Sequence, residues 1–363
     1  MDILGYNCQN FQQRLNLMYI QRVNEAIQAI RQGEIIIIMD DEDRENEGDL
    51  VMAGIFSTAE KINFMATEAR GLICVSLTND IAKKLDLEPM VESNNSNHET
   101  AFTISIDAAS AKTGISAQER DLTIQLMCQE HTAPKDFVRP GHIFPLIAKN
   151  GGVLVRTGHT EASVDICTLA GLKPISVICE IMKADGQMAR NNDLVAFAKK
   201  HNLKILYVSD VIQYRLQYEK LISLESKQES HLLDNPCQKL VFLDHQKNHH
   251  IVYAFSHNLN NPLIYFHKIK QDCEYFENPL SAHQSFMQSL QMLKDEGGYL
   301  ICLSTQPHQD LKTLGIGAQI LREMGIEQFR LLHNEDSQSA LHNFSGISGF
   351  NLNLTQRVLP KQN

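Results

Sequence analysis

An acidic stretch from Asp40 to Asp49 directly follows the apolar run Ile35–Ile38 and offers the most distinctive chemistry in the chain. Seven of the eleven residues from Met39 to Asp49 carry a carboxylate, and one is an arginine. Because crowded carboxylates repel one another, the end of a buried strand tolerates them only where a counter-charge or solvent offsets them. Carboxylate oxygens suit Mg²⁺ or Mn²⁺, whereas Zn²⁺ favours histidine and cysteine. The stretch therefore predicts either a hard-metal site or a solvated acidic turn.

A second cluster, residues 139–159, combines two histidines, two arginines and four glycines. Arg156 is expected to end a strand, Gly158 to allow a tight bend, and Thr160 to open a helix. Backbone N–H groups at a helix start, together with a hydroxyl and a guanidinium group, commonly bind phosphate. His159 could ligate a metal or transfer a proton, although a lone histidine in a turn is more often simply hydrogen-bonded. The density of such groups favours a functional interpretation.

Two further polar groups lie next to predicted secondary structure. Glu119 follows Ser116 by three residues, which is the spacing of a helix capping box, and the nearby Thr113 and Arg120 could contact an anion. Glu180 comes directly after a predicted strand. A carboxylate in that position is a candidate acid or base, although it equally suits a solvated edge residue.

The bulk composition bounds the class of protein. A length of 363 residues corresponds to roughly two domains, and the 43% hydrophobic content is ordinary for a globular protein. The net charge of −10 argues against nucleic-acid binding, which normally requires a basic face. No apolar run approaches the ~20 residues of a membrane helix, and the N-terminus does not resemble a signal peptide. The eight cysteines include no Cys-x-x-Cys pair, which suits a reducing cytoplasm rather than a disulfide framework.

Hydrophobic periodicity in the first half predicts a mixed arrangement of strands and helices, an α+β fold. Val23, Ala26 and Ile30 recur at helical spacing, and Gly33 is a plausible C-terminal cap. Strands are predicted at 35–39, 72–77, 102–106, 153–155, 175–179 and 204–208, and helices at 58–69, 79–85, 119–128, 160–170 and 191–201.

The composition changes beyond about residue 215, which predicts a second domain. The polar segment Ser223–Pro236 is expected to be a linker or loop. The second half has its own predicted strands at 239–243, 250–255, 262–266, 299–303 and 328–332, and its own helices at 281–296 and 315–324.

Five motifs between Val23 and Arg215, in order and with matching spacing, closely resemble 3,4-dihydroxy-2-butanone 4-phosphate synthase of riboflavin biosynthesis. They are Asp40–Asp49, Thr113–Arg120, Arg139–Pro145, Arg156–Ala162 and Glu180–Arg190. The resemblance implies an N-terminal extension at 1–20, a synthase domain at 21–217, a linker at 218–236 and a second domain at 237–363. It also implies a homodimeric lyase that converts ribulose 5-phosphate to 3,4-dihydroxy-2-butanone 4-phosphate and formate.

The resemblance assigns roles residue by residue. It implies that Glu45 and His159 hold Mg²⁺ or Mn²⁺, two ions per site, with no zinc, and that His142 and Glu180 are catalytic. One departure is Glu119, where the family usually has aspartate, and Cys74 lies on a strand that approaches the active site in the family. The expected substrate contacts are Arg44, Glu45, Asp49, Arg156, Thr157, Gly158, His159, Thr160 and Glu180.

Residues 313–332, running into His333-Asn334, resemble the late segment of GTP cyclohydrolase II, but the groups that enzyme needs are missing. The family uses three cysteines for zinc, two of them in a Cys-x-Cys pair, and the corresponding region offers only Cys273. Leu314 replaces the expected tyrosine, and the substrate-binding segments are altered. We expect an inactive second domain. A bifunctional enzyme that also opens GTP, and a regulatory or docking role for the second domain, are the alternatives.

Overall fold

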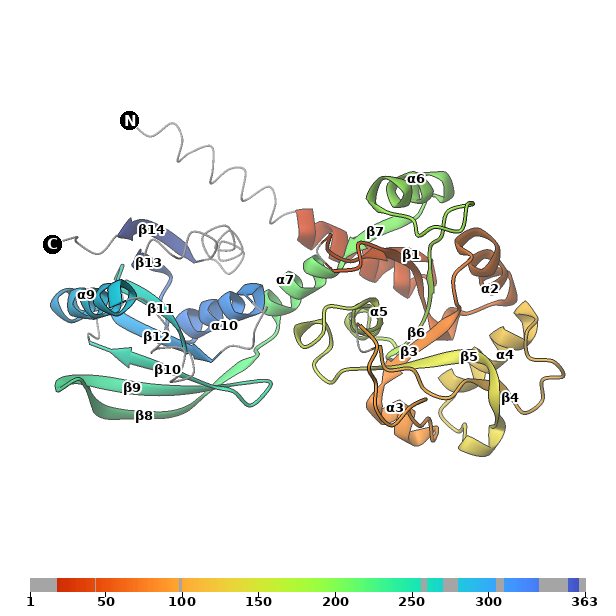
Figure 1. The fold of residues 1–363 in the computed structure, drawn as a ribbon, viewed down its shortest axis with the longest axis horizontal. Coiled ribbons are helices and arrows are strands. Elements are labelled where there is room, and N and C mark those ends of the chain that lie inside the picture. The colour runs from red at the N-terminus through yellow and green to blue at the C-terminus, as the bar shows by residue number, and fades with distance from the viewer. Residues whose placement is uncertain are drawn as a thin grey trace. The chain divides into compact units, whose positions relative to one another are not determined.

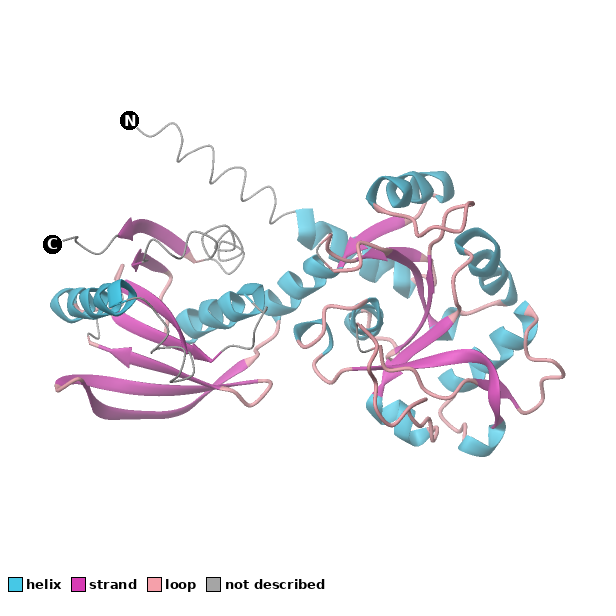
Figure 2. Cartoon of the chain, in the orientation of Figure 1, coloured by secondary structure: helices cyan, strands magenta, loops and turns pink. Residues whose placement is uncertain are grey.

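The computed structural model describes residues 18–42, 44–97, 100–255, 260–269, 280–304, 310–332 and 352–358 (Figure 1). The chain divides into two compact units, one at Tyr19–Ile212 and one that begins at Gln213. Each unit combines a seven-stranded sheet with helices, which confirms the predicted mixed α and β class (Figure 2). Of the expected N-terminal extension, residues 1–17 lie outside the described residues, and residues 18–20 already belong to the first helix.

The sheet of the first unit has the strand order β4-β5-β3-β6-β2-β1-β7. The pairs β1–β7 and β3–β5 are parallel, and the remaining pairs are antiparallel. β1 and β2 are buried along their whole length, which explains why their sequence lacks the alternation of a half-exposed strand. The strands are β1 Ile36–Met39, β2 Gly48–Ala53, β3 Cys74–Thr78, β4 Ile106–Ala108, β5 Phe137–Ala148, β6 Ile175–Glu180 and β7 Lys204–Tyr207.

The helices of this unit begin with residues 18–31, and each predicted helix occurs within a few residues of its expected limits. The predicted helix 58–69 consists of a short α-helix followed by a π-helical turn. The helices are α2 Ala59–Phe64, α3 Asn79–Lys84, α4 Ala117–Cys128, α5 His159–Leu169, α6 Asn191–His201 and α7 Val208–Tyr218, which extends past the limit between the units, with the π-helix η2 Met65–Ala69 and the 3₁₀ turns η1 Gly54–Phe56, η3 Pro134–Asp136 and η4 Gly152–Leu154.

Helix α5 is the element that brings distant parts of this unit together. It packs against strands β1, β2, β3, β5 and β6. Nearly every residue in its first two turns is buried, including the polar His159, Thr160 and Glu161. Burial of so many polar side chains at a helix start requires partners for each of them, so this end of the helix is a specialised part of the fold.

Two strand predictions in the first unit are wrong. Residues 153–155 were expected to be a strand but belong largely to the 3₁₀ turn η4, because Gly152 has a φ of +61° and the Val153 N–H group donates to Asp165 Oδ2 over 2.9 Å. Arg156 therefore follows a turn instead of ending a strand. In the predicted strand 102–106, only its last residue lies in β4, and Phe102 and Thr103 form isolated bridges.

The second unit forms a separate sheet in the order β14-β13-β11-β12-β10-β9-β8. All the strands and helices predicted for this half are present with shifted ends. Leu263, Leu293 and Leu300 lie at the centre of its apolar cluster. The elements are β8 Ile222–Leu232, β9 Asn235–Asp244, β10 His249–Ala254, β11 Leu263–Ile269, α9 Leu280–Glu296, β12 Tyr299–Ser304, α10 Asp310–Glu323, β13 Gln328–Leu332 and β14 Asn353–Val358.

The segment 218–236, expected to be a linker, is not a loop. It contains all of β8 and the start of β9, which pair antiparallel as a hairpin. Leu233 and Asp234 both have positive φ angles, as a two-residue hairpin turn requires. The polar composition of the segment reflects the exposed position of β8 at the end of the described sheet order.

No helix in the described part of the chain is long and apolar enough to cross a membrane.

The Gly315-x-Gly317 pair in α10 serves close packing. A Cβ atom on Gly315 would lie 2.5 Å from Leu216 Cδ1, and one on Gly317 would lie 2.7 Å from Phe266 Cε1. One turn further on, the buried Gln319 donates through Nε2 to the carbonyls of Leu216 (2.6 Å) and Glu219 (2.9 Å). Its Oε1 accepts from the Leu221 N–H group at 2.8 Å. Helix α10 thus supplies partners for the last carbonyls of α7.

We expect Gln319→Leu to lower the free energy of unfolding by about 2–3 kcal/mol, because it leaves three backbone groups without a partner at a buried position. Urea denaturation followed by circular dichroism would measure the loss. The control is Gln291→Leu on the exposed face of α9, which should change stability by less than about 0.5 kcal/mol. Equal stability of the two variants would contradict the structural role of Gln319.

Candidate metal and phosphate site

The acidic loop after β1 is organised by the side chain of Asp40, which is 5% exposed. Its carboxylate accepts the N–H groups of Glu45 (3.1 Å) and Glu47 (2.8 Å) and pairs with the Arg44 guanidinium at 2.8 Å. Asn46 adopts a positive φ of 53°, which returns the chain to β2. Asp40 therefore binds backbone N–H groups as a capping residue does at the start of a helix. The acidic loop is ordered by these hydrogen bonds and is not simply a solvated turn.

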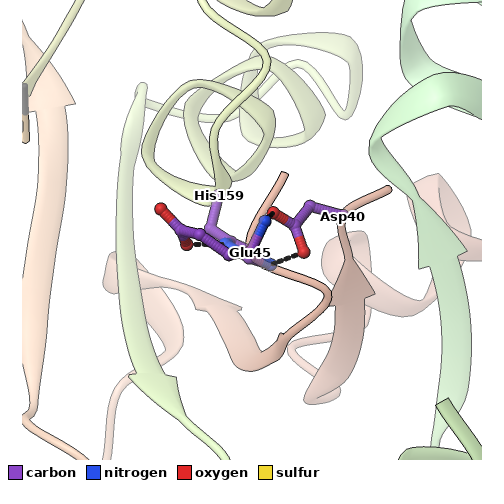
Figure 3. A group of neighbouring side chains, drawn as sticks. All are labelled: Asp40, Glu45 and His159. Atoms are coloured by element: carbon purple, nitrogen blue, oxygen red, sulfur yellow. Dashed lines mark hydrogen bonds and ion pairs between the residues drawn. The ribbon is translucent and has the colours of Figure 1, made fainter. Parts of the chain in front are cut away.

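Asp40, Glu45 and His159 form a group whose ligand atoms all lie within 4.8 Å of one another (Figure 3). His159 Nδ1 is 3.7 Å from Glu45 Oε2, and His159 Nε2 is 3.9 Å from Asp40 Oδ1. Both separations are too long for hydrogen bonds. His159 Nε2 is buried and has no hydrogen-bond partner. A buried imidazole with an unpartnered nitrogen and a carboxylate near each ring nitrogen matches the donor set of a divalent cation.

The electrostatics of this group also favour a cation. Burial raises the pKa of Asp49 above its ordinary value, and the neighbouring Glu180 and Glu45 raise it further, while His159 opposes them. Burial lowers the pKa of His159, but the Asp49, Glu45 and Asp40 carboxylates together raise it above its ordinary value. A proton on the imidazole thus balances the carboxylates, and a metal ion could replace that proton.

The start of α5 forms the other half of the site. Gly158 is the N-cap residue, and the first turn of an α-helix has N–H groups without intrahelical partners. The Arg156 guanidinium donates to Glu161 Oε2 at 2.6 Å and to Thr100 Oγ1 at 3.1 Å. A Cβ atom on residue 158 would lie 2.2 Å from Arg156 Nη1, so a larger residue there would displace the guanidinium from its present position. Thr157 and the buried Thr160 flank the cap. These groups suit an anion such as phosphate.

Asp49 and Glu180 are direct partners across β2 and β6. Glu180 Oε2 accepts the Leu72 N–H group at 2.9 Å. Because Asp49 also lies within electrostatic reach of His159 and Glu45, the fold joins Glu180 to the metal group through a neighbouring carboxylate.

His142 lies on β5, away from the group of Asp40, Glu45 and His159. Its Nδ1 is 2.7 Å from Asp107 Oδ2, and its N–H group donates to Asp107 Oδ1 at 2.8 Å. In the described residues, no hydrogen bond or ion pair joins His142 to the metal group. If the register of β3 is continued by two residues, Leu72 lies between His142 and Glu180, two strand spacings or roughly 10 Å across.

The capping box predicted at the start of α4 is present in altered form. Ser116 Oγ accepts the Glu119 N–H group at 3.2 Å. The Glu119 carboxylate binds the preceding loop, with contacts to the Lys112 N–H group (2.6 Å) and the Thr113 hydroxyl (2.9 Å). These hydrogen bonds lower the pKa of Glu119 to about 2. Glu119 is therefore a structural residue, and the Thr113 hydroxyl is already in use by it.

Sequence reasoning missed three residues of this region. Asp40 was part of the acidic stretch but was given no role, although a carboxylate directly after a buried strand is a usable signal. Asp107 and Glu161 carried no signal of this kind. Their functions depend on partners 35 and 5 residues away, His142 and Arg156, which only the folded chain identifies.

Comparison with known proteins agrees with this geometry. Residues 24–214 match the family of 3,4-dihydroxy-2-butanone 4-phosphate synthase, and residues 263–359 match the family of GTP cyclohydrolase II. A protein of Helicobacter hepaticus named 3,4-dihydroxy-2-butanone 4-phosphate synthase is 58% identical over 94% of this chain and 99% of its own length. The riboflavin biosynthesis protein RibBA of Bacillus subtilis is 38% identical over 93% of this chain and 92% of its own.

Two solved structures are similar to the chain at different extents. The first is RibBX, a two-domain 3,4-dihydroxy-2-butanone 4-phosphate synthase of A. baumannii. The match spans 94% of this chain and 99% of RibBX, with 36% identity and a TM-score of 0.79. A second synthase, crystallised with two magnesium ions, covers 54% of this chain and 97% of its own, with 40% identity and a TM-score of 0.52. The chain belongs to the 3,4-dihydroxy-2-butanone 4-phosphate synthase family.

Proposed function

We propose that the first unit converts ribulose 5-phosphate to 3,4-dihydroxy-2-butanone 4-phosphate and formate in riboflavin biosynthesis. The observation that carries the proposal is the buried His159 imidazole, which lies between the carboxylates of Asp40 and Glu45 and whose Nε2 has no hydrogen-bond partner. This metal group lies at the start of α5, where Gly158 caps the helix and Arg156 is held beside it. A phosphorylated sugar needs both features.

We assign Glu45 and His159 as ligands of Mg²⁺, with Mn²⁺ as a possible substitute, and add Asp40 as a group that faces the ion. The two magnesium ions of the similar synthase structure support the choice of metal and a pair of ions. Bound Mg²⁺ would act as a Lewis acid that acidifies the C–H bond of the hydroxyl-bearing carbon next to the ketone of the substrate. Arg44 pairs with Asp40 at 2.8 Å and Glu45 at 3.0 Å and so keeps both carboxylates oriented.

We assign the phosphate of the substrate to the N-terminus of α5. Arg156, Thr157, Gly158 and Thr160 provide a guanidinium group, two hydroxyls and backbone N–H groups there. The Glu161 carboxylate fixes the direction of the Arg156 guanidinium at the start of α5. Arg44, Asp49 and Glu180 would then face the sugar carbons.

Glu180 and His142 are the proposed proton-transfer groups. Glu180 lies beside Asp49 in the sheet, and burial together with the neighbouring Glu180 charge raises the pKa of Asp49 above its ordinary value. Two adjacent carboxylates can serve as general acid and general base in proton transfer. His142 is 43% exposed at its side chain, whereas its partner Asp107 is 8% exposed. The buried carboxylate accepts from Nδ1 and leaves Nε2 directed outward as the group that can exchange a proton.

The proposal includes a homodimer in the cytoplasm. The described cysteines Cys74, Cys128, Cys167, Cys179, Cys237 and Cys302 carry free thiols, which suits a reducing compartment.

For the second unit we propose a folded domain without GTP cyclohydrolase II activity. Zinc sites in proteins use several cysteine or histidine ligands at tetrahedral geometry. The described part of the second unit contains no group of three metal-ligating side chains, whereas the first unit contains one. Cys273 and the neighbouring His283 lie outside the described side chains. A regulatory or docking role for this unit is the alternative.

The metal assignment predicts that His159→Ala and Glu45→Ala each weaken Mg²⁺ binding more than about 100-fold, since loss of mere outer-shell partners already costs about 10–100-fold. Titration calorimetry with MgCl₂ would measure it, and circular dichroism would establish that the variants fold. His142→Ala should bind Mg²⁺ like the unmodified protein because His142 lies outside the metal group. Unchanged affinity in both ligand variants would reject the assignment.

The Asp107–His142 contact predicts that Asp107→Asn lowers kcat by about 10–100-fold, because general acid–base catalysis contributes about 10²–10⁴-fold and the amide leaves His142 present but poorly oriented. KM and Mg²⁺ affinity should stay within about threefold. Formate release from ribulose 5-phosphate, followed by NMR, is the assay. A kcat equal to that of the unmodified protein would remove Asp107 from the mechanism.

The second-unit proposal predicts that the chain releases formate from ribulose 5-phosphate but none from GTP, even with added Zn²⁺. Both reactions release formate, but in the described residues only the synthase reaction has its metal-ligating side chains in place. Parallel NMR assays on the full chain, with either substrate, would test this. Zn²⁺-dependent formate release from GTP would instead establish a bifunctional enzyme.

A further inference from the structure

The connection between α2 and β3 is fastened to the end of β6, where Glu180 lies. The π-helical turn Met65–Ala69 places the Ala69 carbonyl where it accepts the Met182 N–H group at 2.9 Å. Arg70, in a left-handed conformation with a φ of 67°, forms an isolated bridge with Ile181 and donates through Nη1 to the Met182 carbonyl. π-helical turns are costly insertions that recur at functional sites.

Gly71 follows and lies closer to Glu180 than any residue with a side chain could. A Cβ atom there would lie 2.3 Å from the Glu180 carbonyl oxygen, 2.8 Å from its backbone nitrogen and 2.7 Å from Oε2. The two backbone atoms cannot move without shifting β6. The absence of a side chain lets the next residue, Leu72, approach and donate its N–H group to Glu180 Oε2 over 2.9 Å.

We infer that Gly71 and the Leu72 N–H group are positioning elements for Glu180. They hold one carboxylate oxygen by a charge-assisted hydrogen bond and leave the other, Oε1, to exchange a proton with the substrate. This inference rests on the proposed function, in which Glu180 transfers protons. Among the described residues, no other hydrogen bond reaches the Glu180 side chain, so the Leu72 N–H group is the contact that sets its direction.

The arrangement would be unnecessary for a purely structural edge residue. Leu72 is 42% exposed, yet its backbone is held in place by the bridge between Arg70 and Ile181 and by the close approach of Gly71 to Glu180. A solvated carboxylate at the end of a strand needs no such donor, because water can supply it. A proton-transfer group needs a fixed direction, since a displacement of 1 Å can cost about 10²-fold in rate.

The test removes the donor alone. Replacing Leu72 with its α-hydroxy acid counterpart turns the peptide N–H into an ester oxygen and keeps the side chain; Leu72→Pro removes the same N–H group by ordinary mutagenesis. Leu72→Ala keeps the N–H donor, so it separates the effect of losing the side chain from the effect of losing the donor. Each change is made in the full chain and again in a Glu180→Gln background, with Mg²⁺ present and formate followed by NMR.

We expect the ester and Leu72→Pro to lower kcat by about 10–100-fold with KM within about threefold, and Leu72→Ala to lose much less. In the Glu180→Gln background the ester should cause no further loss, because residues that act through one another are not additive. Gly71→Ala should show the same dependence on Glu180.

Equal losses in both backgrounds would overturn the inference and leave Leu72 a structural residue, and no loss in either background would overturn it as well. Unfolding of Leu72→Pro would leave the ester as the deciding variant. An unmodified chain that binds Mg²⁺ but releases no formate from ribulose 5-phosphate would reject the proposed function itself, and with it this role for Glu180.

Discussion

The rest of the first unit depends on one electrostatic constraint, the burial of several carboxylates around His159. Asp40, Asp49 and His159 are each less than a tenth exposed, and water cannot offset their charges there. The free energy of such a cluster is acceptable only if hydrogen bonds and a cation balance it. The backbone N–H groups of the acidic loop and the guanidinium of Arg44 satisfy part of this need at Asp40. The negative charge of the carboxylates that is not balanced in this way makes the cluster suitable for a divalent ion.

The sheet and α5 convert this constraint into a site. Ile38, Asp49 and Glu180 lie in one row across β1, β2 and β6, so the acidic loop and the proposed base meet at one end of the sheet. Helix α5 packs over the same strands and brings its N-terminus, with Gly158 as cap, to that end. The acidic loop is thereby joined to Arg156–Glu180, more than a hundred residues later in the chain, which supplies His159, the anion-binding groups and the proposed proton-transfer group.

The second unit keeps the packing residues that its fold needs whether or not a ligand binds. Gly315 and Gly317 pack against Leu216 and Phe266, and Gln319 satisfies backbone groups at the end of α7. Packing of this kind constrains small and buried residues whether or not a ligand binds. In the inactive domain that we propose, cysteines that hold zinc in the family would have no such packing role. This gives a physical reason why the apolar and glycine positions of the cyclohydrolase pattern are recognisable in the sequence while the cysteine pattern is not.

Local patterns in the sequence determined the class of fold, most helices, and the residue types at the site. Hydrophobic periodicity located α4, α5 and α6, and the motif spacing identified Glu45, His159, Arg156 and Glu180 as candidates. Tertiary structure decided what periodicity cannot encode. The strand expected at 153–155 became a turn because Asp165 binds its backbone, and the polar segment 218–236 became a hairpin because an edge strand tolerates charge. The partnerships of Asp40 with His159, Asp107 with His142, and Leu72 with Glu180 were decided only by folding, since each joins groups at least 35 residues apart that helix packing or strand pairing brings together.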